Sequence, residues 1–179
     1  MRCFHPPVWI LSAKVMHGVK DPETGVIVAS YDEEHLLENQ IFQALQSFTG
    51  RYDNVRVVNI SFGDPTLCIS GGKQQSMLAS FIDELAHKHG LMFVISTGNN
   101  DEMDFPDRYP HYLYEDGERC RIIDPASSVY ALTVGSITQD YVSHKAEAIL
   151  APHQGYPSPF TRAGPGLNGM IKPELVEVG

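Results

Sequence analysis

The chain has 179 residues, of which 42% are hydrophobic and 20% charged, so one domain spanning residues 1–179 with one compact core is expected. The formal net charge is −9, which opposes the phosphate backbone and argues against nucleic acid as a partner. No apolar run reaches the length of about eighteen residues that a membrane-spanning helix needs, so a membrane partner is not expected either.

Three apolar runs in the first hundred residues predict strands. They cover residues 8–16, 55–61 and 91–96. Each is short, rich in β-branched or large apolar side chains, and bounded by glycine, proline or polar residues, which is typical of strands buried on both faces of a parallel sheet.

Two helices are predicted between these strands. The first runs from about Tyr31 to Thr49, because Ser30 and Glu33 have capping-box spacing and apolar residues recur at helical intervals before Gly50. The second begins near Met77 and stops at Gly90. Strands alternating with helices imply right-handed βαβ crossovers, hence an α/β fold with a mainly parallel sheet and a ligand site beyond the carboxyl ends of the strands.

The second half of the chain is predicted to be less regular. Residues 100–128 are rich in Asp, Pro and Tyr and read as a long acidic loop, followed by a strand over 129–136 and then by short strands and turns. The loop is a solvated surface segment by default, with a calcium site or a substrate-gating lid as alternatives, and no metal ligand is assigned.

Four ordered segments resemble motifs of subtilisin-like serine peptidases, the subtilases of peptidase family S8. Residues 57–63 (VVNISFG) and 93–99 (FVISTGN) are similar to the substrate-binding and oxyanion-hole strands of that family. Residues 158–166 (SPFTRAGPG) and 171–179 (IKPELVEVG) are similar to its SFSxRGP and KPDxxAPG segments. Ala163 and the ending Val-Glu-Val-Gly depart from those patterns and indicate a divergent branch. The resemblance implies a three-layer α/β/α subtilisin-like fold, incomplete in this chain.

The resemblance also implies roles for particular residues. Asn99 corresponds to the asparagine that donates a hydrogen bond to the oxyanion, a role suited to a neutral amide. The residues expected to bind the peptide substrate are Ser61, Phe62, Gly63, Ser96, Thr97 and Gly98. A cis peptide bond is expected at Asp124-Pro125 on the same grounds. No organic cofactor is implied, and the partner is a peptide or protein substrate.

None of the family's three catalytic segments is found. Gly-Thr-Ser, His-Gly-Thr and the aspartate turn are missing, and Pro22 prevents a helix after His17-Gly18, so His17 is expected in a loop. The chain is therefore interpreted as the central part of a serine endopeptidase and is expected to be inactive alone. The alternatives are a pseudopeptidase or peptide-binding module and, more distantly, a nucleotide-binding domain.

Two further expectations follow from the same interpretation. A strand that the family has inside its sheet is missing, which predicts exposed strand edges and self-association, swapping or local disorder near the N-terminal strand. Three widely spaced cysteines, Cys3, Cys68 and Cys120, predict free thiols and favour a reducing compartment.

Overall fold

The computed structural model divides the chain into two compact units, Met1–Val55 and Arg56–Gly179. It describes residues 8–31, 36–69, 74–100, 109–110, 113, 120–139, 151 and 153–179. In these ranges no helix is both long and apolar enough to span a membrane. The two units are described separately.

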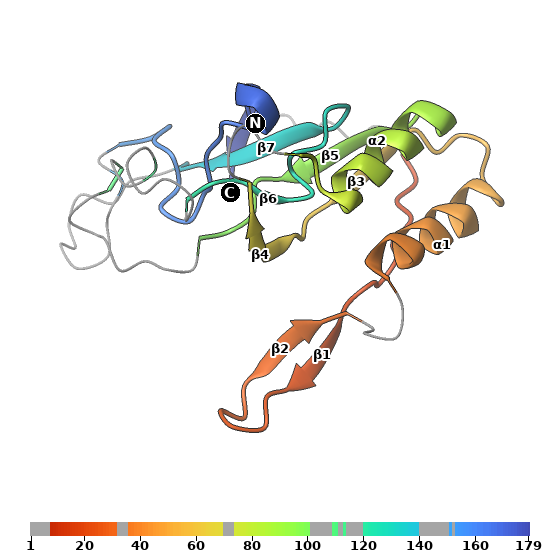
Figure 1. Ribbon diagram of the computed structural model, residues 1–179, viewed down its shortest axis with the longest axis horizontal. Coiled ribbons are helices and arrows are strands. Elements are labelled where there is room, and N and C mark those ends of the chain that lie inside the picture. Colours follow the sequence, from red (N-terminus) through yellow and green to blue (C-terminus); the bar gives the residue numbers. More distant parts are fainter. Residues whose placement is uncertain are drawn as a thin grey trace. The chain divides into compact units, whose positions relative to one another are not determined.

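The first unit contains a β-hairpin that the sequence patterns did not predict. Strands β1 (His17–Lys20) and β2 (Ile27–Ser30) pair antiparallel, as Figure 1 shows. The turn is held by Asp21, whose Oδ1 accepts hydrogen bonds from the backbone N–H groups of Glu23 at 2.9 Å and Thr24 at 2.7 Å. Gly25 supplies the positive φ of 72° that closes such a turn at little cost.

The strand predicted over residues 8–16 is wrong, because these residues have no regular structure. An apolar run becomes a buried parallel strand only when other strands pair with its backbone, and none of the described strands does so. Trp9 consequently remains 91% exposed. His17 lies in β1 and not in the predicted loop, although no helix follows it.

Helix α1 (Leu37–Thr49) confirms the predicted helix in its body but not in its start. Ile41 and Leu45, two members of the expected apolar stripe, are buried. The helix begins after Leu36 without a side-chain cap, and Ser30 ends β2, where its hydroxyl donates to the Tyr31 carbonyl at 3.2 Å. The other half of the expected capping box, Glu33, lies outside the described residues.

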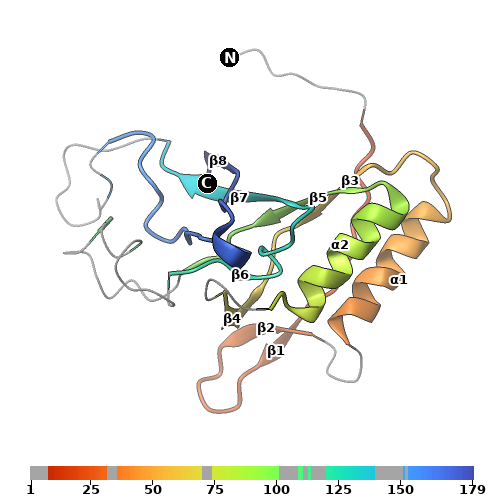
Figure 2. The same ribbon diagram turned by 45° about the horizontal axis from the view of Figure 1, so that its top comes forward.

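A four-stranded parallel sheet forms the centre of the second unit. Its strands lie in the order β3 (Val57–Ile60), β5 (Met92–Ser96), β7 (Leu132–Ile137) and β8 (Leu175–Val178), as Figure 2 shows. Every neighbouring pair is parallel. The α/β fold with a mainly parallel sheet is thus confirmed, with its first two strands where the sequence predicted them.

Helix α2 (Met77–His89) covers one face of this sheet (Figure 1). Ser76 caps its first turn, with Oγ accepting the Ala79 N–H at 3.0 Å, and Gly90 ends it in the left-handed conformation at φ 61°. Helix α2 contacts β5, and Ile82 on the helix and Phe93 and Ile95 on the strand are fully buried, so apolar burial holds helix and sheet together.

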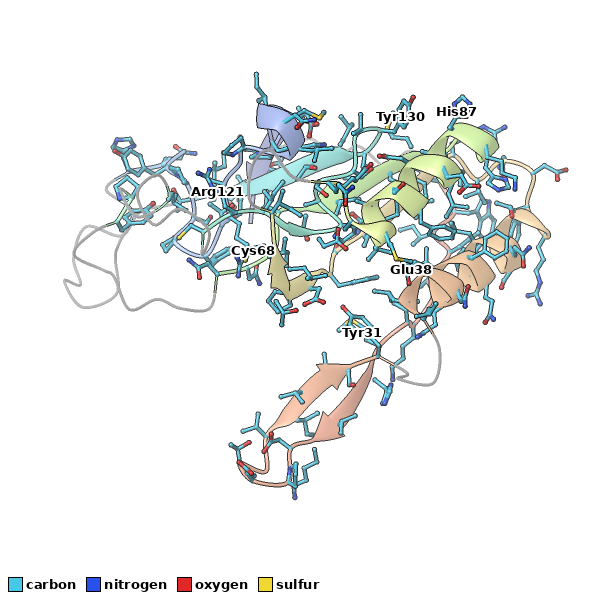
Figure 3. The ribbon with its side chains drawn as sticks, in the orientation of Figure 1. Tyr31, Glu38, Cys68, His87, Arg121 and Tyr130 are labelled. Atoms are coloured by element: carbon cyan, nitrogen blue, oxygen red, sulfur yellow. The ribbon has the colours of Figure 1, made fainter. Side chains whose placement is uncertain are left out.

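Strand β7 begins three residues later than the apolar pattern indicates. The carboxylate of Asp83, buried on α2, accepts hydrogen bonds from the backbone N–H groups of Val129 at 3.0 Å and Tyr130 at 2.8 Å and from the Ser128 hydroxyl. These residues therefore form a turn tied to the helix. Figure 3 shows Tyr130 beside His87 of α2, and their rings stack with centroids 6.3 Å apart.

Two short strands lie beside the main sheet. β4 (Asp64–Cys68) pairs antiparallel with β6 (Ile123–Asp124), which falls within the segment predicted to be irregular. A 3-10 turn, η2 (Leu167–Gly169), precedes β8. The β4–β6 pair brings the end of the long loop back to the carboxyl end of β3, and this return shapes the candidate site.

Candidate functional site

The two predicted peptide-binding segments lie side by side at the carboxyl edge of the sheet. β3 and β5 are parallel neighbours, with Ile60 opposite Ile95. Residues 61–63 and 97–99 therefore leave the sheet next to each other. The ends of adjacent parallel strands are where α/β folds place their ligands.

The first segment, Ser61-Phe62-Gly63, leads from β3 into β4. Ser61 is exposed, and its Oγ accepts a hydrogen bond from the Asn59 amide at 2.7 Å. A Cβ added at Gly63 would lie 2.6 Å from the Asp124 carbonyl oxygen and 2.8 Å from Cδ1 of Ile123. Glycine is required here because β6 packs against the backbone of this segment.

The second segment, Ser96-Thr97-Gly98, has its middle residue anchored in the core. Thr97 is 2% exposed, its N–H donates to the Val134 carbonyl at 3.1 Å, and its hydroxyl lies 3.4 Å from that of Thr161. Ser96 and Gly98 are half-buried. Gly98 has φ 89°, a conformation that L side chains rarely adopt. The segment is thus rigidly held while its outer residues stay accessible.

Asn99 combines a fixed backbone with a free side chain. It forms a β-bridge with Thr161, and its carbonyl accepts a hydrogen bond from Nε of Arg162 at 2.7 Å. Its neighbour Asn100 is buried, with N–H donating to the Phe160 carbonyl at 2.7 Å. The Asn99 residue itself is exposed, and its amide makes no hydrogen bond within the described part of the chain. A donor is therefore presented to solvent from a backbone that is held on both sides.

Arg162 was quoted in a resembling segment but given no role by sequence reasoning. Only 6% of it is exposed, and besides Asn99 its guanidinium contacts two other segments. Nη1 donates to the Arg121 carbonyl at 3.1 Å and lies 3.4 Å from Sγ of Cys68, two residues that Figure 3 labels on neighbouring segments. One buried cation thus ties the Asn99 loop to the end of β4 and to the residues before β6.

The expected cis bond at Asp124-Pro125 is confirmed. Asp124 is buried, and its carboxylate accepts a hydrogen bond from the hydroxyl of Ser76, the residue that also caps α2. The position of β6 is consequently set by the start of the helix, about fifty residues earlier in the chain.

The segment leading into β8 is also anchored by a buried charge. Nζ of Lys172 lies 2.6 Å from Oε1 of Glu174 and donates to the Ala131 carbonyl at 2.9 Å. Oε2 of Glu174 accepts the Thr133 N–H at 2.8 Å. The Lys-Pro-Glu part of the resembling segment therefore fixes β8 to the start of β7.

Several predictions fall on residues that the structure does not describe. Most of the acidic loop 100–128, with its alternative calcium site or lid, and Cys3 are among them. Within the described ranges no cluster of three or more His, Cys, Asp or Glu side chains could hold a metal ion. Neither Cys68 nor Cys120 forms a disulfide bond, and the buried Cys120 accepts a contact from the Asn100 amide at 3.4 Å.

The model of the subtilase family, peptidase S8, matches residues 13–179. An uncharacterized protein, y4bN of Sinorhizobium fredii (strain NBRC 101917 / NGR234), is 35% identical over 135 residues, which are 69% of this chain and 31% of that protein. The chain thus spans about a third of the length of this curated relative. A solved structure, the prenylagaramide maturation protease PagA, is 18% identical with a TM-score of 0.41, covering 76% of this chain and 36% of that one.

Proposed function

Because the chain belongs to the subtilase family, we propose that it forms the substrate-binding and oxyanion part of a longer serine endopeptidase. That enzyme cuts peptide bonds through an acyl-enzyme. Asn99 donates to the oxyanion, and the extended peptide lies between residues 61–63 and 96–98. No organic cofactor is required, since the nucleophile, the base and the orienting carboxylate complete the reaction.

The main support for the proposal is that Asn99 has a firmly held backbone and an exposed side-chain amide. Transition-state stabilisation works best when the donor is already oriented, so that no reorganisation is needed as charge develops. The Thr161 bridge and the Arg162 hydrogen bond hold the Asn99 backbone, while its amide stays exposed and unused by the described residues. This combination supports a preoriented oxyanion donor.

The two neighbouring segments support peptide binding by strand addition. An extended substrate needs backbone groups to pair with and little side-chain bulk in the way. Ser61 and Gly63 on one side and Ser96 and Gly98 on the other have small side chains or none, and all four are exposed or half-buried. The peptide then runs past Asn99, with its scissile carbonyl near the Asn99 amide.

The 179-residue chain alone is inactive on this proposal. It contains no Gly-Thr-Ser, His-Gly-Thr or Asp-Thr-Gly segment, so it has no group matched to the nucleophile, base or orienting aspartate. The longer protein supplies these segments. A pseudopeptidase, which keeps the cleft without the chemistry, is the competing function that the experiment must separate.

Fluorophosphonate labelling of the longer protein tests the proposal. We expect labelling of the longer protein and none of the 179-residue chain. Labelling of the Asn99→Ala variant should be slower by about 10²–10³-fold, which is the loss of kcat that follows removal of this donor in subtilisin. Asn100→Ala is the control, because its amide points to Cys120 and not to solvent. A folded longer protein that is never labelled indicates the pseudopeptidase, and equal losses in both variants contradict the role of Asn99.

Self-association remains part of the proposal. Among the described strands β3 pairs only with β5, so its other edge carries unpaired backbone groups of the kind that bind further strands. We expect the 179-residue chain to form dimers or larger species as its concentration rises. A single monomeric species in sedimentation velocity at every concentration contradicts this expectation.

A further inference from the structure

The side chain of Ile123 fills the space between the two candidate peptide-binding segments. A Cβ added at Gly98 would lie 2.4 Å from both Cδ1 and Cγ1 of Ile123. A Cβ added at Gly63 would lie 2.8 Å and 2.9 Å from the same two atoms. The two glycines come from different segments, yet a side chain added to either one would meet the same isoleucine. Ile123 therefore lies between the two segments.

The surrounding structure holds Ile123 in this place. It is only 4% exposed, and its N–H donates to the Thr97 carbonyl at 3.3 Å. The next residue, Asp124, pairs with Asp64 of β4 and accepts a hydrogen bond from Ser76. The backbone of Ile123 is thus fixed beside both segments, and its buried side chain packs against Gly63 and Gly98.

We propose that Ile123 determines the specificity of this site by leaving room only for a small side chain, such as that of glycine, alanine or serine, in the residue before the scissile bond. The inference rests on the proposed function, because it takes residues 61–63 and 96–98 as the walls of the pocket for that residue. A larger side chain would need the volume that Ile123 already occupies, and close-packed interiors accept such an addition only with strain.

The first test measures kcat/KM of the longer protein for peptides that differ only in that residue, Ala, Leu or Phe. The unchanged protein is expected to prefer Ala. Ile123→Ala should raise the Leu-to-Ala ratio by at least about tenfold, the lower end of the effect of one methylene in a pocket. Ile123→Val, which disturbs folding less, should shift the ratio in the same direction by a smaller factor. The control is Ile122→Ala, an equal truncation of a fully buried neighbour, which should leave the ratio unchanged.

The second test does not depend on catalysis and separates a failure of this inference from a failure of the proposed function. Peptides ending in Ala, Leu or Phe are titrated into the 179-residue chain while the amide resonances of Gly63 and Gly98 are followed. Binding of the Ala peptide alone, with Leu admitted by Ile123→Ala, supports the role of Ile123 even if the longer protein proves catalytically silent. Three results overturn the proposed role of Ile123. These are tight binding of the Phe peptide to the unchanged chain, an unaltered peptide preference in Ile123→Ala, and no binding by any of the peptides.

Discussion

The hairpin of β1 and β2 and the loops around Asn99 are held together over very different distances along the chain. In the hairpin the outermost pair, His17 and Ser30, lies only 13 residues apart along the chain, and Asp21 organises the turn from within it. Around Asn99, the contacts of Arg162 span 41, 63 and 94 residues. The hairpin is therefore a local structure, whereas the site exists only once distant segments have assembled.

This difference predicts where single substitutions matter. In the site region, one buried polar group often satisfies several backbone groups from another part of the chain. Removing it leaves those groups buried and unpaired, which costs more than losing an exposed contact. In the hairpin the corresponding groups can return to water.

The largest expected effect is that of Asp83→Ala. Its carboxylate accepts hydrogen bonds from Ser128, Val129 and Tyr130. We expect the free energy of unfolding to fall by about 3–5 kcal/mol, near the low end of about 1–3 for each of the three donors, because Val129 and Tyr130 are themselves partly exposed. Glu84→Ala, an exposed neighbour on the same helix, should change it by less than about 0.5 kcal/mol. Urea unfolding followed by circular dichroism checks both, and similar values for the two variants would contradict the assigned role.

Gly98→Ala should have the next largest effect. We expect a loss of about 2–4 kcal/mol, from a left-handed backbone and from overlap with Ile123. Gly90→Ala is the matched control, since Gly90 also has positive φ but nothing lies within 4 Å of the added Cβ, so only about 1–2 kcal/mol is at stake. If the double variant Gly98→Ala with Ile123→Ala recovers no stability, the overlap is not the cause.

Arg162→Lys should have a smaller effect, because the charge is retained while the planar arrangement of donors is lost. We expect about 1.5–3 kcal/mol less stability, the value of one hydrogen bond to a charged group. In the longer protein, we also expect fluorophosphonate labelling to slow, since the Asn99 carbonyl loses its Nε donor. Arg51→Lys, at an exposed position, serves as the control for both measurements. Labelling at the full rate would show that Arg162 does not orient Asn99.

The smallest effect belongs to the hairpin. Hydrogen bonds from the Thr24 backbone and side chain, with one from the Glu23 backbone, hold the pKa of Asp21 below its ordinary value of 3.8. The carboxylate's contribution is therefore complete above that value and is lost as the pH falls through the lower, folded-state pKa. The Thr24 amide resonance should report a midpoint below 3.8, and this titration should vanish in Asp21→Asn. A midpoint at or above 3.8 would contradict the turn geometry.

The same contrast explains what could be predicted from the sequence. The cores of β3, α2 and β5 followed from short apolar patterns with clear ends, and their parallel order placed residues 61–63 beside 97–99. The run 8–16 failed because a strand needs partners that a local pattern does not contain. The start of β7 was misplaced because Asp83, 46 residues before Val129, competes for its backbone.

Two contributors to the site could not be found from the sequence. Ile123 lay in a segment whose composition suggested only a loop, and nothing local indicates that its side chain contacts Gly63 and Gly98. For Arg162 the sequence did offer an indication, because it lies in one of the segments that resemble family motifs, and a charged residue in such a segment can have a structural role. Its contacts with Asn99, Cys68 and Arg121 depend on tertiary structure and were not predictable.

The anchoring of β8 has a consequence for the order in which the chain is made. Lys172 donates to the Ala131 carbonyl, 41 residues earlier, so β8 can join β7 in the sheet only after these further 41 residues have been synthesised. At about 5–20 residues per second, synthesis of that interval takes roughly 2–8 seconds. During this time the outer edge of β7 is open to chaperones or to other nascent chains.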